Sequence, residues 1–237
     1  MKSQINFNAA KEKRKNVNID HLSVNDNRQY DFTHYPDEER KEYNIISGLI
    51  QNGATVVDLG YGNGSLLVWL QKDHSARIKG VELSPSGIQA CQAKELDVVQ
   101  SRIDEHNPFE DNSFDYAVCN VTIQMVMYPE VFLSEMKRIA RYQIISFPNF
   151  AFYRNRIQFV LSGKMPTHML FGYQWYSTGH IHQLSLKDFK NLVYIAGGLE
   201  IRELHCVGID NFLKKFFMQN FPNLFMHIPI MLLEKNG

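Results

Sequence analysis

The chain has few cysteines, no net charge and no long apolar run, and each of these absences excludes a class of protein. Its three cysteines, Cys91, Cys119 and Cys206, are odd in number and far apart, which indicates neither a disulfide framework nor a zinc site. Lysines and arginines number 25, and so do aspartates and glutamates. The chain therefore lacks the basic excess that is typical of nucleic-acid binding.

Hydrophobic segments of the kind that cross membranes or direct export are also lacking. No run of about 18 uninterrupted apolar residues is present, so we expect no membrane span. Residues 1–16 are charged and have no apolar centre, which argues against a signal peptide. Together with the cysteine pattern, these absences predict a protein of the reducing cytoplasm.

Short apolar runs alternate with helical segments through most of the chain, as in α/β proteins with a doubly wound sheet. The runs are continuous rather than alternating, which favours a parallel sheet covered on both faces. We expect a tail or cap over 1–35 and a single domain over 36–237, with a lid-like insertion at about 151–184. Strands are predicted over 55–59, 77–83, 98–103, 114–120, 142–147, 199–207 and 227–234, and helices over 36–50, 65–74, 85–95, 130–140 and 185–196.

The most informative segment is 55–64, Thr-Val-Val-Asp-Leu-Gly-Tyr-Gly-Asn-Gly. It predicts a buried strand, a glycine turn and a helix start. Glycines permit positive φ and let a ligand approach the main chain, and the following helix presents free N–H groups. An ordinary strand–helix turn is the alternative. Glu82, near the end of the next predicted strand, favours a ligand site because a carboxylate there suits a ribose diol.

The pattern Asp-x-Gly-x-Gly-x-Gly at 58–64 resembles the first motif of class I S-adenosylmethionine-dependent methyltransferases. A nicotinamide-binding fingerprint would place its third glycine at Ser65 rather than at Gly64, which disfavours an oxidoreductase. The resemblance implies a mostly parallel, seven-stranded Rossmann-like sheet with an antiparallel last strand, and S-adenosylhomocysteine as product. The cofactor contacts that it implies are Asp58, Gly60, Tyr61, Gly62, Gly64, Glu82, Leu83, Arg102, Ile103, Asn120 and Val121.

One position departs from that family pattern. An aspartate after the third strand usually accepts from the adenine amino group, but Arg102 stands there and cannot accept a hydrogen bond. Either Asp104 substitutes, or main-chain groups contact adenine, or affinity is reduced.

Candidate acceptor contacts follow the later strands. We expect Gln124, Asn149, Tyr153, Trp175 and Tyr176 to face the acceptor, although loop hydrogen bonding or a satellite core would explain them equally well. His180 and His182 are the predicted general bases, since histidine titrates near neutral pH. Metal binding is not expected, because no further ligands are apparent nearby.

Further segments resemble one branch in particular, the methionine-biosynthesis protein MetW. They are 57–67, Phe-Pro-Asn-Phe at 147–150, Gly-Lys-Met-Pro at 163–166 and Trp-Tyr-Ser-Thr-Gly-His-Ile-His at 175–182. This resemblance implies an association with homoserine O-acyltransferase. Two functions therefore stay open: methyl transfer to a small-molecule or glycan-like acceptor, by a monomer or homodimer, or a non-catalytic partner of an acyltransferase.

The apolar segment 212–225 has three interpretations. Pro222 interrupts it, so a long amphipathic face cannot continue. We expect a helix and hairpin packed on the sheet edge, with a membrane-surface helix or a dimer interface as alternatives.

Overall fold

A seven-stranded sheet forms the centre of the protein. The computed structural model describes residues 40–74, 77–170, 173–176, 178–208 and 211–236. The predicted tail and the predicted helix start at 36–39 lie outside these residues. The described strands are β1 (Thr55–Leu59), β2 (Arg77–Glu82), β3 (Val98–Gln100), β4 (Phe114–Asn120), β5 (Ala140–Ser146), β6 (Leu199–Cys206) and β7 (Pro229–Lys235).

The strand order is β3-β2-β1-β4-β5-β7-β6. Strands β1 to β5 pair in parallel, whereas β7 runs antiparallel to both β5 and β6. This confirms the predicted doubly wound sheet with an antiparallel last strand. Because β7 is reversed, it begins at the edge of the sheet where the parallel strands end.

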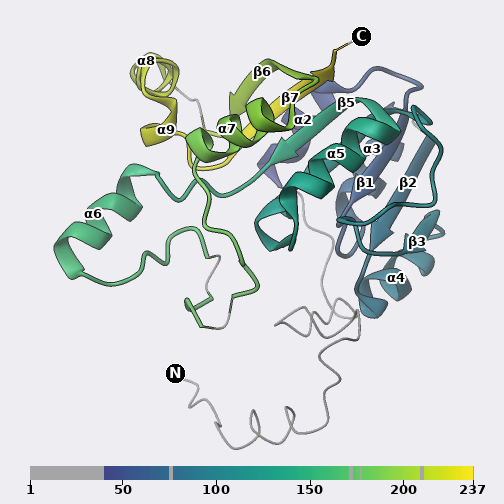
Figure 1. Cartoon of the computed structure of the whole chain (residues 1–237), viewed down its shortest axis with the longest axis horizontal. Helices are drawn as coiled ribbons and strands as arrows, with labels where there is room; N and C mark the ends of the chain where they lie inside the picture. Colours follow the sequence, from purple (N-terminus) through teal and green to yellow (C-terminus); the bar gives the residue numbers. More distant parts are fainter. Residues whose placement is uncertain (1–39, 75–76, 171–172, 177, 209–210, 237) are drawn as a thin grey trace, which may run out of the picture.

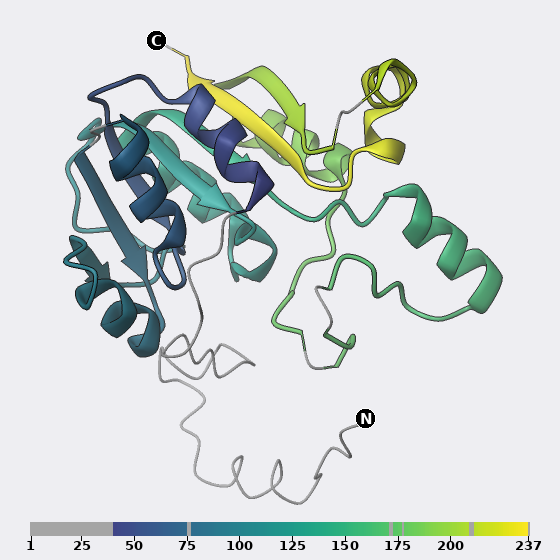
Figure 2. The same ribbon diagram turned by 180° about the vertical axis from the view of Figure 1, so that it is seen from behind.

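Helices cover both faces of the sheet (Figures 1 and 2). Alternate strand residues point to opposite faces, so Val57 packs towards α5 and α7 and Val56 towards α2 and α3. The helices and the single 3₁₀ turn of the described residues are α2 (Lys41–Leu49), α3 (Ser65–His74), α4 (Pro85–Gln92), η2 (Ile123–Met125), α5 (Pro129–Ile139), α6 (Tyr153–Ser162), α7 (Leu186–Ala196), α8 (Phe212–Asn220) and α9 (Pro222–Phe225).

Local sequence explains where several helices begin. Ser185 caps α7: its hydroxyl accepts from the Asp188 N–H, and the Asp188 carboxylate accepts from the Ser185 N–H. Prolines occupy the first turn of α4, α5 and α9, where no N–H is needed. No helix in the described part of the chain is long and apolar enough to cross a membrane.

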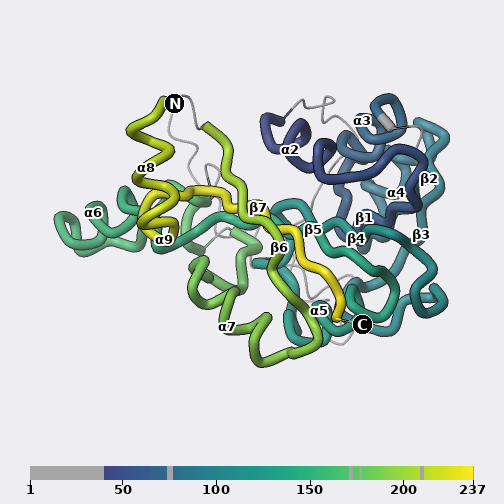
Figure 3. Tube along the Cα trace, turned by 90° about the horizontal axis from the view of Figure 1, so that it is seen from above, coloured from purple at the N-terminus to yellow at the C-terminus, as the bar shows by residue number. Residues whose placement is uncertain are grey.

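The segment between β5 and α7 differs from the prediction because it contains a helix, α6, that the sequence did not indicate. This helix extends away from the sheet (Figure 1), and Asn155 is its one buried residue. Seen from above in Figure 3, α6, α8 and α9 lie at the opposite end of the molecule from β2 and β3. Pro222 does divide the predicted 212–225 segment, into α8 and α9.

Candidate functional site

A cavity of about 970 Å³ opens at the carboxyl ends of β1, β2 and β4. Ligands in open α/β sheets bind at this edge, where the strand order reverses. Its walls come from the start of α2, the glycine turn, the ends of β2 and β3, the loop after β4, Tyr173 with residues 178–181, and the turns flanking β6 and β7. The lining includes the predicted residues Asp58, Gly60, Tyr61, Gly62, Glu82, Leu83, Arg102, Ile103, Asn120, Val121, Gln124 and His180.

The three glycines of the turn do not serve one purpose. All have positive φ, +83° at Gly60, +61° at Gly62 and +78° at Gly64. A Cβ at Gly60 would lie 2.4 Å from Cγ2 of Thr122, and one at Gly64 would lie 2.5 Å from Sγ of Cys91. The protein's own packing therefore requires both glycines. Gly64 does not line the cavity, contrary to its predicted role as a cofactor contact.

Asp58 is a buried acid facing the cavity. Its side chain is 2% exposed, and Oδ1 has no hydrogen-bond partner. Burial, together with the negative charge of Glu82, raises the Asp58 pKa to about 8. A buried acceptor without a donor is costly. A ligand ammonium at this point would supply the donor and favour the charged carboxylate.

Glu82 is held at the cavity wall by the main chain. Oε2 accepts from the Gly62 N–H at 2.9 Å, and Oε1 accepts from the Leu83 and Ser84 N–H groups at 2.9 Å each. The structure thus brings the glycine turn and the predicted ribose acid into direct contact. Its carboxylate faces the cavity in a fixed position.

Arg102 lines the cavity, but Asp104 holds its guanidinium. Nε and Nη2 of Arg102 donate to the two oxygens of Asp104 at 3.0 and 2.9 Å, and both side chains are buried. Oδ2 of Asp104 also accepts from the main-chain N–H groups of Met127 and Tyr128. The two residues form one unit that joins the loop after β3 to the loop after β4. Asp104 also lines the cavity, and both of its oxygens already accept hydrogen bonds from the protein.

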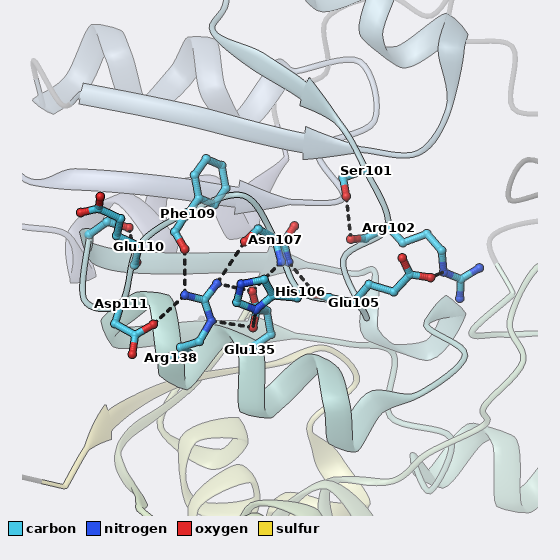
Figure 4. Close-up of polar contacts among 11 residues, drawn as sticks. Ser101, Arg102, Glu105, His106, Asn107, Phe109, Glu110, Asp111, Glu135 and Arg138 are labelled. Carbon is cyan, nitrogen blue, oxygen red and sulfur yellow. Dashed lines mark hydrogen bonds and ion pairs between the residues drawn. The ribbon is translucent and has the colours of Figure 1, made fainter.

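A polar network that the sequence did not indicate fixes the remainder of the loop after β3 (Figure 4). Arg138 of α5 donates to the carbonyls of Asn107 and Phe109 at 3.1 and 2.7 Å and pairs with Asp111 and Glu135. Glu135 in turn accepts from the Asn107 N–H at 2.7 Å. Burial raises the Glu135 pKa, but the hydrogen bonds from Arg138 and Asn107 outweigh it and hold the pKa below its ordinary value.

The loop after β4 carries backbone strain at the cavity. Val121 has φ +53°, a value that is rare for a β-branched residue. Its N–H donates to the main chain and hydroxyl of Ser146, and its carbonyl accepts from Nε2 of Gln124 at 2.8 Å. The carbonyl of Gln124 accepts from the N–H groups of Ile181 and His182 at 2.9 and 3.0 Å. Gln124 therefore ties the second half of the insertion to the cavity.

Two histidines line the cavity, His180 and His227, whereas the predicted base His182 does not. His180 is buried in the wall, with its ring edge-on to Phe150. His182 is not a lining residue, and its Nε2 lies 3.4 Å from the Met127 carbonyl. His227 lines the cavity and was missed by the sequence analysis, which included it in a strand. Its position before the reversed β7 was the signal that could have found it.

The predicted acceptor contacts other than Gln124 lie outside the cavity lining. Asn149 is fully buried, donates to the Met226 and Asn223 carbonyls at 2.7 and 3.0 Å, and accepts from the Ala151 N–H, so it fixes a turn. The Tyr153 ring packs on Phe225 at 5.7 Å. Trp175 and Tyr176 are more than half exposed. Tyr173, which was not singled out as a contact, lines the cavity instead.

Sheet order, reversed last strand and cavity together define a class I methyltransferase-type fold. A methyltransferase in complex with the Haloferax volcanii Trm112 methyltransferase activator superposes with a TM-score of 0.59 at 18% identity, covering 84% of this chain and 91% of that one. The family described as methionine biosynthesis protein MetW matches residues 40–233. The chain belongs to the MetW family.

Two curated relatives match parts of the chain. The bifunctional methionine biosynthesis protein MetXA/MetW of Rhodopirellula baltica is 33% identical over 158 residues, which are 62% of this chain and 25% of that protein. Norajmaline N-methyltransferase of Rauvolfia serpentina is 31% identical over 111 residues, 44% of this chain and 38% of the enzyme. The matched region thus spans a quarter to about two fifths of these relatives.

Proposed function

We propose that the protein binds S-adenosylmethionine and transfers its methyl group to a small-molecule or glycan-like acceptor. The observation that carries this proposal is the pair of carboxylates at one end of the cavity, Asp58 with an unpartnered buried oxygen and Glu82 fixed by main-chain donors. An amino acid ammonium matches the first, and a ribose diol matches the second. When bound, the cofactor supplies an electrophilic methyl group on a sulfonium.

The cavity is large enough for more than the cofactor. Its volume of about 970 Å³ lies at the upper end of small-molecule sites, which measure about 300–1,000 Å³. The space beside His180, Tyr173 and His227 would hold the acceptor. The protein's contribution would be placement of the two reactants, because alignment alone can supply much of the acceleration.

Deprotonation of an acceptor hydroxyl needs a base at this wall. We assign it to His180 or His227. Burial and the nearby Arg154 charge lower the His227 pKa, so its imidazole is neutral at pH 7 and able to accept a proton. His182, turned to the Met127 carbonyl, would position the segment rather than act on the acceptor.

We propose further that the protein works in the cytoplasm, as a monomer or a homodimer.

Calorimetry with S-adenosylmethionine tests the site. Asp58→Asn and Glu82→Ala should each weaken binding by about 10-fold or more, because hydrogen bonds to charged groups contribute about 1.5–3 kcal/mol. Asp97→Ala is the matched control. Asp97 is an exposed acid that pairs with Lys79 of β2, so this variant should bind as wild type. Gly60→Arg is a poor test because it would collide with Thr122. Equal affinities in all four proteins would refute the assignment.

A second function is favoured by the Rhodopirellula baltica relative, whose name joins MetXA and MetW in one protein. In this alternative the chain regulates a homoserine O-acyltransferase without turnover. Mixing the chain with the MetXA part of that relative and measuring acyl transfer distinguishes the two functions. Stimulation that persists in Glu82→Ala, with no S-adenosylhomocysteine released from any acceptor tried, would favour the partner role over methyl transfer.

A further inference from the structure

Acidic residues are distributed unevenly along the chain. Residues 136–187 and 211–233 contain no aspartate or glutamate, so all 25 acidic residues lie outside these two stretches. Both stretches contain lysine or arginine. The formal charge of the whole chain is zero, but these two stretches each carry a net positive charge.

The two acid-free stretches meet at one end of the molecule. The Tyr153 ring at the start of α6 lies 5.7 Å from that of Phe225 in α9, and Phe152 lies 5.9 Å from His227. Figures 1 and 3 show α6 and α8 projecting at this end, away from the sheet. We call residues 153–165 together with α8 the α6–α8 end.

Large apolar side chains cover this end without being buried. Val160 and Leu161 of α6 are 79% and 81% exposed, and Phe212 of α8 is 85% exposed. Exposed apolar residues in such number on two helices at the same end of the molecule mark an interaction surface. The other exposed apolar residues here are Ile157, Phe159, Met165, Leu213 and Phe216.

Cations lie among these apolar side chains. Arg154, Arg156 and Lys164 are exposed, and no carboxylate of the described residues forms an ion pair with them. Nε of Arg156 instead donates to the Ala151 carbonyl, and the Arg154 guanidinium lies over the Tyr153 ring. Lys214 and Lys215 directly follow the exposed Phe212 and Leu213. The α6–α8 end thus combines exposed apolar and positive groups and lacks negative ones.

We propose that the α6–α8 end docks onto the surface of an anionic lipid bilayer. Basic residues attract anionic headgroups, and partly inserted Phe, Leu and Val side chains add apolar burial. The lysines Lys164, Lys214 and Lys215 favour this partner over a protein, because protein interfaces are depleted of lysine. The absence of acids over both stretches suits a partner whose charge has one sign throughout. This proposal does not depend on methyl transfer.

Sedimentation with vesicles tests the docking on the full chain. Wild type should bind vesicles of phosphatidylcholine with 30% phosphatidylglycerol at least about 10-fold more tightly than pure phosphatidylcholine vesicles, since each basic residue near an anionic surface contributes about 1 kcal/mol. Raising the salt should weaken this binding. Lys214→Glu/Lys215→Glu should reduce it by about 10-fold or more.

Matched variants separate location from charge and hydrophobicity. Lys72→Glu/Lys79→Glu makes the same charge change on α3 and β2 and should bind as wild type. Val160→Asp/Leu161→Asp should lose binding, whereas Tyr194→Asp/Ile195→Asp, at 85% and 70% exposed positions on α7, should keep most of it. Circular dichroism of each variant checks folding.

Three results would overturn the proposal. The first is absence of vesicle binding by wild type, and the second is equal loss in the matched variants. The third is that an acidic protein binds wild type but not Lys214→Glu/Lys215→Glu, while vesicles bind neither of them. In that case the α6–α8 end is a protein-docking surface.

Discussion

The sheet body and the α6–α8 end use similar residues in opposite ways. In the body, defined as the sheet with α2–α5 and α7, Val57, Phe132 and Ile145 have no exposed surface. At the α6–α8 end, Val160, Leu161 and Phe212 are mostly exposed. The comparison shows that apolar composition does not by itself identify core: a neighbouring element must be present to cover the side chain.

The largest contrast should come from two phenylalanines. Phe189→Ala in the body removes a fully buried ring packed 5.0 Å from that of Phe147, and it should cost about 3–5 kcal/mol of unfolding free energy. Phe159→Ala, on the half-exposed face of α6, should change stability by less than about 0.5 kcal/mol. Urea denaturation measures both. Similar losses would show that α6 is packed in solution.

Removing Arg138 should have the next largest effect. Arg138→Met leaves Glu135 buried without its main partner, which should cost about 3 kcal/mol. Arg202→Met, which breaks surface ion pairs with Glu200 and Glu234, is the control and should cost much less than Arg138→Met.

The Glu135 network also predicts a pH dependence. Folding lowers the pKa of Glu135. Its contribution to folding stability is therefore present above the ordinary glutamate pKa and is lost as the pH falls through the pKa of the folded state. Wild type should therefore lose stability on acidification, and Arg138→Met should lose less of it. Denaturation at pH 3 and pH 6 compares them, and identical losses would contradict this account.

Asp58 should give the opposite pH dependence. Its pKa is raised to about 8 on folding, so the folded state binds more protons than the unfolded one and stability falls as the pH rises from about 4 to 8. Asp58→Asn cannot ionise and should therefore be more stable than wild type at pH 8. Thermal unfolding at pH 5 and pH 8 measures the difference. If the stability difference between wild type and Asp58→Asn is the same at pH 5 and pH 8, the raised pKa of Asp58 is excluded.

The smallest effect should distinguish two glycines with positive φ. Gly60→Ala meets Thr122, whereas Gly163→Ala at the end of α6 meets nothing within 4 Å. The left-handed conformation should lower the unfolding free energy of both variants by about 1–2 kcal/mol. Gly60→Ala should lose about 1 kcal/mol more, because its methyl group overpacks against Thr122. Equal costs would mean that Thr122 moves aside.

Elements built on local patterns were predicted closely. The predicted ranges 55–59, 65–74 and 114–120 match β1, α3 and β4 residue for residue, because continuous apolar runs bounded by glycine or polar turns carry their own signal. The third strand was predicted to reach residue 103 but ends at Gln100. The chain turns at 103–104, where Arg102 pairs with Asp104, and a pattern of apolar residues contains no information on such a pair.

The candidate site was predicted in part. Asp58, Gly62 and Glu82 meet at one cavity because strand ends share an edge, which the strand order implies. The sequence did not indicate that Asn149 joins the turn after β5 to the turn before β7, because these contacts are with residues far away in the chain. His227 and Arg138 were missed for the same reason.

The sequence alone determined the class of fold, the family and the position of the glycine turn, because each depends on residues that are neighbours along the chain. Tertiary structure decided which histidines face the cavity, which glycines the packing requires and where the two acid-free stretches meet. These outcomes depend on contacts between distant segments, and such contacts exist only once the sheet has brought those segments together.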